Sequence, residues 1–169
     1  MKEGVVCMKK LFVYLIVAIV VYSAMCEMSY GLSEYGYRDA KIVWLKGKVQ
    51  VKKADSKKWI DAQKGMILKE EDMLKTSSKS AVKVIFDEQG SFEGNEFDGF
   101  NMESSTTITL SKLTYDVKTN ERITILDLPN GTIIAHSTKL EGESRFEVIT
   151  PTQIVGVRGT NFKVTVGLQ

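Results

Sequence analysis

Hydrophobic residues recur at every second position over several short stretches of this chain. Within residues 81–86 and again within residues 161–166, apolar side chains alternate with other residues, which places them on one face of a β-strand. Short apolar runs bounded by turn residues predict further strands at residues 40–45, 48–51, 59–60, 66–68, 73–76, 106–110, 122–126, 132–135 and 146–149. We therefore predict a single all-β domain of short, mostly antiparallel strands, arranged as a sandwich or as a β-solenoid or roll.

Two segments between these runs have a different character. Asn130-Gly131 separates two apolar runs, and this dipeptide predicts a two-residue hairpin turn. With Thr132 it also matches a glycosylation acceptor, but the hairpin is the better interpretation. Residues 90–105 mix glycine, asparagine and acidic residues, and predict a long loop. Its aromatic residues either form a contact surface or attach the loop to the domain; they are Phe92, Phe97 and Phe100.

The N-terminus has the pattern of an export signal. Lys9 and Lys10 precede an uncharged apolar run over residues 11–26, which is shorter than a typical membrane-spanning helix. We predict a signal peptide over residues 1–31, cleaved after Gly31, and a mature domain over residues 32–169 outside the cytoplasm, either periplasmic or secreted. Two alternatives are an uncleaved membrane anchor formed by residues 11–26 and a lipid attached to Cys26.

Composition narrows the possible partners and chemistry of the mature domain. Both cysteines, Cys7 and Cys26, lie in the predicted leader, so we expect no disulfide and no thiol chemistry in the domain. The formal net charge of the whole chain is +2, and basic and acidic residues are interspersed after the leader. A nucleic-acid surface would show a clustered basic excess, so no nucleic-acid partner is expected. Contact with a membrane is expected only through an uncleaved N-terminal segment.

No pattern of catalytic or cofactor-binding residues emerges. His136 is the single histidine and has no evident nucleophile or carboxylate partner, and one histidine cannot build a zinc site. Glu70, Glu71 and Asp72 form an acidic cluster that could be imagined as a glycosidase pair or calcium site, but a solvated face is the better interpretation. No glycine-rich phosphate-binding loop is present. We therefore predict a protein that is not an enzyme and that has no cofactor and no metal.

The stretch TPTQIVGVRGTNF, at residues 150–162, is the most informative part of the chain. Pro151 ends the preceding apolar run, and Gly156 and Gly159 flank Arg158 inside the next one. Glycine within a strand pattern indicates a bulge or a close approach of two backbones. An arginine among apolar residues needs a partner, because burying an unpaired charge costs several kcal/mol. Two aspartates near strand ends are candidate partners, Asp72 and Asp87, and the sequence does not choose between them.

This stretch resembles the signature of the FecR domain family. The residues that match the signature are Thr150, Pro151, Val157, Arg158, Gly159, Thr160 and Phe162. The resemblance extends back over roughly residues 40–166, through a strand-glycine-strand unit around Gly47, a segment from Trp59 to Thr76, and the run at residues 82–91. The chain departs from the family pattern at Glu71, where a glycine is usual. It also stops at Gln169, where members commonly continue, which suggests a truncated or minimal copy.

The resemblance implies an extracytoplasmic all-β domain. The best-known members relay a signal from an outer-membrane transporter to a sigma factor, through a cytoplasmic segment that precedes the membrane. Here only ten residues precede the apolar run, so we expect a stand-alone exported member. The expected function is non-enzymatic binding of an envelope protein in signalling or in transport regulation. The alternatives are a structural or polysaccharide-binding envelope module, and a hydrolase that uses Glu70, Glu71 and Asp72.

Overall fold

The computed structural model describes residues 35–88, 98–157, 159 and 161–167. These residues belong to one unit of the chain, Glu34–Gln169. The predicted leader lies outside the described residues, so its cleavage after Gly31, its retention as an anchor and a lipid on Cys26 stay predictions. Among the residues that are described, no helix is long and apolar enough to cross a membrane.

The described residues form twelve β-strands, which confirms the predicted all-β class. The strands are β1 (Tyr35–Lys46), β2 (Val49–Lys52), β3 (Trp59–Asp61), β4 (Ile67–Leu68), β5 (Met73–Thr76), β6 (Ala81–Glu88), β7 (Gly99–Met102), β8 (Thr107–Asp116), β9 (Arg122–His136), β10 (Arg145–Ile149), β11 (Ile154–Val157) and β12 (Asn161–Val166). Each apolar run that predicted a strand lies wholly or mostly within one of these elements, because alternation places one row of side chains in a shared core.

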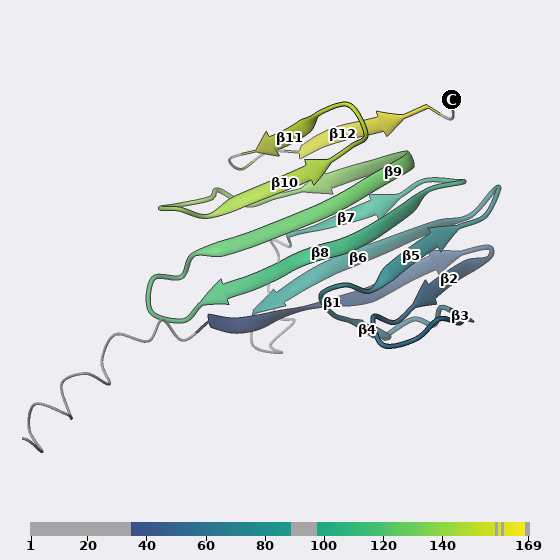
Figure 1. The fold of residues 1–169 in the computed structure, drawn as a ribbon, viewed down its shortest axis with the longest axis horizontal. Helices are drawn as coiled ribbons and strands as arrows, with labels where there is room; N and C mark the ends of the chain where they lie inside the picture. The colour runs from purple at the N-terminus through teal and green to yellow at the C-terminus, as the bar shows by residue number, and fades with distance from the viewer. Residues whose placement is uncertain (1–34, 89–97, 158, 160, 168–169) are drawn as a thin grey trace, which may run out of the picture. The chain divides into compact units, whose positions relative to one another are not determined.

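The strands pair into one sheet that curls, so that its two halves face each other (Figure 1). One half, here called the first half-sheet, has the order β3-β2-β5-β8-β9-β10-β11, and the second half-sheet has the order β4-β1-β6-β7-β9-β12. The long strands β1 and β9 pass from one half to the other. Every pairing is antiparallel except that of β9 with β10, so the predicted mostly antiparallel arrangement is confirmed.

The predicted hairpin at Asn130-Gly131 is wrong, because both residues lie inside the continuous strand β9. Asn130 pairs with Thr107 in the first half-sheet, whereas Gly131 pairs with Val166 in the second. Gly131 has a φ of 99°, and a Cβ at this position would collide with Thr106. Glycine with a positive φ is usual in tight turns, but here Gly131 lets the long strand β9 bend from one half-sheet into the other.

The predicted loop over residues 90–105 is also corrected, since it contains strand β7. Phe100 lies in β7 with 1% of its surface exposed, so its ring belongs to the core and not to a contact surface. It packs against Phe86 at a ring-centroid distance of 5.7 Å. Phe92 and Phe97 lie outside the described residues.

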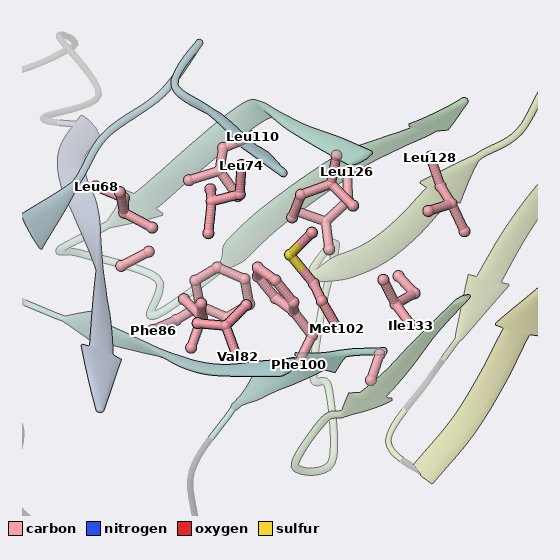
Figure 2. Packing of buried hydrophobic residues seen from close by; sticks show 14 of the residues in the cluster. Leu68, Leu74, Val82, Phe86, Phe100, Met102, Leu110, Leu126, Leu128 and Ile133 are labelled. Carbon is pink, nitrogen blue, oxygen red and sulfur yellow. The ribbon is translucent and has the colours of Figure 1, made fainter. Parts of the chain in front are cut away.

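The core fills the space between the two half-sheets. Figure 2 shows leucines of the first half-sheet, Leu74, Leu110 and Leu126, facing Val82, Phe100 and Met102 of the second, and all six are buried. Two further ring contacts continue this layer to the C-terminal strands, with centroid distances of 5.9 Å between Phe86 and Phe146 and 5.8 Å between Phe146 and Phe162. The row of rings ties β10 and β12 to β6, so the C-terminal strands share one core with the rest of the domain.

Candidate functional site

The strands β11 and β12 are edge strands at the C-terminal end of the curled sheet, and together they are here called the C-terminal edge. In the described part of the chain, β11 pairs with β10 alone and β12 pairs with β9 alone. A strand with one paired side presents backbone N–H and C=O groups on the other side, and these can accept a further strand. The core-facing side chains of this edge are only partly covered; they are Val155, Val157, Phe162 and Val166.

A turn over Thr150–Gln153 positions this edge, and its hydrogen bonds explain why Thr150 and Pro151 stand there. The Thr150 hydroxyl donates to the Gln153 carbonyl at 2.9 Å and accepts from the Gln153 N–H at 3.1 Å. The Thr150 N–H also donates to the Gln153 carbonyl, at 2.9 Å. Pro151 lies at the exposed tip, where no backbone N–H is needed. Both residues therefore shape the hairpin of β10 and β11.

A hollow of about 380 Å³ lies beside this turn. Pro129 in β9, Pro151 and Thr152 in the turn, and Thr165 and Val166 in β12 contribute to its lining. The hollow therefore joins the turn to the end of the C-terminal edge, and its volume suits one or two amino-acid side chains of a bound segment.

The two glycines that flank Arg158 differ in their environments. Gly159 has a φ of 87°, and a Cβ there would lie 2.6 Å from the Cα atom of Lys139. Gly156 lies within β11 opposite Glu147, and a Cβ there would meet only the Glu147 Cγ atom, at 4.0 Å. Only Gly159 thus has the backbone role that the sequence suggested. Arg158 and Thr160 lie outside the described residues, so the structural role of Arg158 stays a prediction.

The acidic cluster at residues 70–72 is not a uniform solvated face. The Asp72 carboxylate is buried and accepts from Lys53 Nζ at 2.7 Å and from two backbone N–H groups, of Ala54 at 3.0 Å and Lys69 at 2.9 Å. Glu70 accepts from the Leu113 N–H at 3.1 Å, and Glu71 is exposed. The expectation of a solvated face is therefore wrong for Asp72, whose carboxylate organises the turn before β5. The Asp87 side chain lies outside the described residues.

His136 lies between two asparagine side chains. Its Nε2 atom is 3.2 Å from Asn101 Nδ2 and its Nδ1 atom is 2.9 Å from Asn161 Oδ1. Because an amide nitrogen donates and an amide oxygen accepts, the ring accepts from Asn101 at Nε2 and donates to Asn161 at Nδ1 in this arrangement. Among the described residues, no three histidine, cysteine or acidic side chains gather in a way that could hold a metal ion.

A buried ionic cluster around Asp98 was not anticipated from the sequence. The Asp98 side chain is 2% exposed, and its Oδ2 atom accepts from Arg38 at 2.6 Å and from Arg122 at 3.0 Å. Its Oδ1 atom accepts from the Thr138 N–H at 2.6 Å and from the Thr138 hydroxyl at 2.8 Å. The cluster thus joins β1, the start of β9 and the segment that follows β9. A signal was present in the sequence, since Arg38 shares the core-facing side of β1 with Ala40 and Ile42.

The environment of Asp98 favours its charged form. Burial alone raises the pKa of the carboxyl group, but the charge of Arg38 and the hydrogen bonds from Thr138 and Arg38 outweigh burial. The net result is a pKa below the ordinary value for aspartate. Arg38 is further held by the Thr124 hydroxyl at 2.8 Å and by the face of the Phe86 ring, whose centroid lies 4.9 Å away. These contacts assign the cluster a structural role.

The fold and the C-terminal edge define an all-β domain whose final strands complete the core and, among the described residues, leave one side unpaired. Residues 99–168 match the family model described as "FecR protein", so the chain carries a FecR domain over this range. The matched range covers β7 to β12 and the turn formed by Thr150 and Pro151. Comparisons with curated proteins and with solved structures found no match. The family match does not extend to residues 40–98, where the resemblance seen in the sequence stays a prediction.

Proposed function

We propose that this chain is an extracytoplasmic, non-enzymatic protein-binding module that acts in envelope signalling or in transport regulation. One observation carries the proposal: the last two described strands of the FecR domain each have one side that pairs with no other described strand, above partly covered core side chains. Such edges bind extended segments of other proteins, because main-chain hydrogen bonds supply affinity and alternate side chains supply specificity.

The chemistry of the C-terminal edge defines the partner segment that fits it. The side chains of β12 are partly or fully buried on the core side, at Phe162, Val164 and Val166, and exposed on the other side, at Asn161, Lys163 and Thr165. A segment that continues this sheet needs the same alternation, with apolar residues toward the core and polar residues outward. The occupant is therefore an amphipathic extended segment of a partner protein, and one of its side chains enters the hollow beside Pro151.

The edge is tested with charged substitutions of half-buried or exposed apolar residues. Val166→Lys places a charge at the end of β12, beside the hollow, and Ile60→Lys places one on β3, the edge strand of the opposite side. Residues 34–169 are used, since the described core is built within this unit. Partners retained by the domain from its own envelope fraction are identified, and a peptide of the retained segment is titrated into each variant.

We expect Val166→Lys to weaken peptide binding at least tenfold and Ile60→Lys to leave it within twofold, with both variants folded by circular dichroism. Equal peptide binding by both variants would show that the C-terminal edge is not the binding surface. Loss of binding in both, with folding retained, would move the contact to another surface and would likewise refute the proposal.

Export is tested separately, because it rests on residues 1–31 alone. We expect a reporter fused after residue 31 to be exported and to show cleavage after Gly31 by N-terminal sequencing. A reporter that stays in the cytoplasm would refute the extracytoplasmic part of the proposal and leave the binding edge untouched.

A further inference from the structure

The outer face of the second half-sheet carries polar side chains in two adjacent rows, here called the polar strip: Lys83, Asn101, His136, Asn161 and Lys163. The half-buried Ile134 lies between Asn101 and Lys163 in the first row. Strand register places them on neighbouring strands, because Lys83 pairs with Asn101, and both Asn101 and Lys163 pair with Ile134. His136 and Asn161 are direct partners in the adjacent row. At about 4.8 Å between strands, the strip crosses β6, β7, β9 and β12 over roughly 14 Å.

Hydrogen bonds hold the centre of the strip in one arrangement. Asn101 Nδ2 lies 3.2 Å from His136 Nε2, and His136 Nδ1 lies 2.9 Å from Asn161 Oδ1. The three planar side chains therefore fix one another across three strands. Asn101 uses one amide hydrogen on His136, which leaves its second hydrogen and its carbonyl oxygen available to a ligand. Groups that are already ordered lose little entropy when they bind.

A hollow of about 550 Å³ opens over the strip where Gly99 lies. Gly99 pairs with both Ile85 and His136, and a Cβ at this position would collide with the Val84 carbonyl oxygen. No other residue fits there without a backbone shift, so Gly99 places no side chain between its cross-strand neighbours Ile85, which is buried, and His136. The lining of the hollow also includes Lys139 and Asn161.

Three lysines, two of them next to a glutamate, and one aromatic side chain surround the hollow. Lys83 is exposed and forms no ion pair with any described residue. Lys139 is exposed and lies 3.7 Å from Glu141, while Lys163 contacts Glu103 at 2.8 Å. Trp44 is the cross-strand partner of Lys83 and is 50% exposed on the same face. Its ring lies in the same row as the lysine and the amide of Asn101.

We propose that the polar strip binds an acidic polysaccharide, a polymer of sugars that carry carboxylate groups. The lysines would bind the carboxylates, the Asn101 amide would exchange hydrogen bonds with hydroxyl groups, and Trp44 would pack against a sugar ring. This surface lies on β6, β7, β9 and β12, outside the core-facing side of the C-terminal edge, so the inference stands independently of the proposed protein partner.

The directional side chains favour a polysaccharide over a membrane surface. A surface that binds lipid headgroups combines basic residues with exposed apolar side chains that insert. In this strip Ile134 is half-buried between Asn101 and Lys163, and two amides and an imidazole lie beside it. A flat row of hydrogen-bonding groups over a hollow suits the hydroxyl-rich face of a sugar chain. Binding of anionic lipid is therefore an outcome against the proposal.

The probe is an oligogalacturonate, titrated into residues 34–169 and followed by NMR, with neutral dextran oligomers of equal length as the comparison. We expect saturable binding of the acidic oligomer alone, weaker at higher salt, with the largest shifts at Asn101, His136 and Trp44. Lys83→Gln should weaken binding about tenfold, and Asn101→Ala about fivefold. The matched control is Lys75→Gln, since Lys75 is also an exposed lysine within a strand but lies in the first half-sheet.

Four outcomes would overturn the proposal. Dextran could bind as well as the acidic oligomer, Lys75→Gln could weaken binding as much as Lys83→Gln, or the oligomer could fail to bind at millimolar concentration. In a last experiment, vesicles of phosphatidylglycerol compete with the acidic oligomer for the domain. Vesicles that displace the oligomer from the polar strip would assign this face to a membrane.

Discussion

Replacing Asp98 by asparagine should destabilise the domain more than any substitution at a surface charge. The substitution keeps the shape of the side chain but places an amide where a carboxylate now accepts from Arg38, Arg122 and Thr138. Whichever side the new NH₂ group occupies, it meets donors at 2.6 to 3.0 Å. The arginine charges remain near a site that is 2% exposed, and breaking a buried pair by removing one partner costs about 3–5 kcal/mol.

Thermal unfolding measures this loss. For a domain of this size, each kcal/mol corresponds to about 3–5 °C, so we expect Asp98→Asn to lower the melting temperature by about 10–20 °C. The matched control is Glu141→Gln, which removes an exposed ion pair with Lys139 and should change the melting temperature by less than about 2 °C. A melting temperature for Asp98→Asn within about 3 °C of the wild type would refute the cost assigned to the cluster.

Four further predictions concern single residues. The pKa of Asp98 is lowered in the folded state. The contribution of its carboxylate to the free energy of unfolding is therefore complete above the unfolded pKa, near about 4, and is lost as pH falls through the folded pKa. In urea titrations, the stability difference between wild type and Asp98→Asn should shrink below about pH 4. Glu71→Gly should stabilise by about 0.5–1 kcal/mol and Glu71→Ala should not, because Glu71 has a φ of 67° that favours glycine; equal urea midpoints for both variants would contradict this reason. Gly131→Ala should destabilise by about 2–4 kcal/mol in the same assay, since it combines a φ of 99° with a collision at Thr106, and a loss below about 1 kcal/mol would show that β9 can bend otherwise. Arg158→Ala should lower the melting temperature more than it lowers partner binding, and unchanged melting with lost binding would make Arg158 a contact residue.

The local pattern of apolar and polar residues predicted most of the strands, because alternation at every second residue can be recognised without knowing which strand is the partner. Residues 161–166 alternate in the sequence and alternate between the core-facing and outer sides of β12 in the structure. The same local reasoning failed at Asn130-Gly131, where the dipeptide has turn chemistry whether the chain reverses or merely bends. Pairing of Gly131 with Val166 decides between these outcomes, and that pairing depends on a strand thirty residues further on.

The candidate sites depended even more on long-range register. Arg38 stood on the core-facing side of its strand, yet its partner Asp98 lies sixty residues away, beyond the reach of one sequence without its fold. The polar strip arises only when β6, β7, β9 and β12 align, which brings Lys83, Asn101 and Lys163 into one row. By contrast, Thr150 and Pro151 act within their own turn, and their position between two strands was predictable from the sequence.

Site-specific photocrosslinking in living cells is the sharpest test of whether the C-terminal edge holds a partner protein. A photoreactive residue is placed at Thr165 on β12, beside the hollow, or at Trp59 on the opposite edge strand β3. We expect one discrete crosslinked envelope protein from position 165, absent from position 59 and lost with Val166→Lys. Crosslinking of the same protein from both positions, or from position 59 alone, would contradict it.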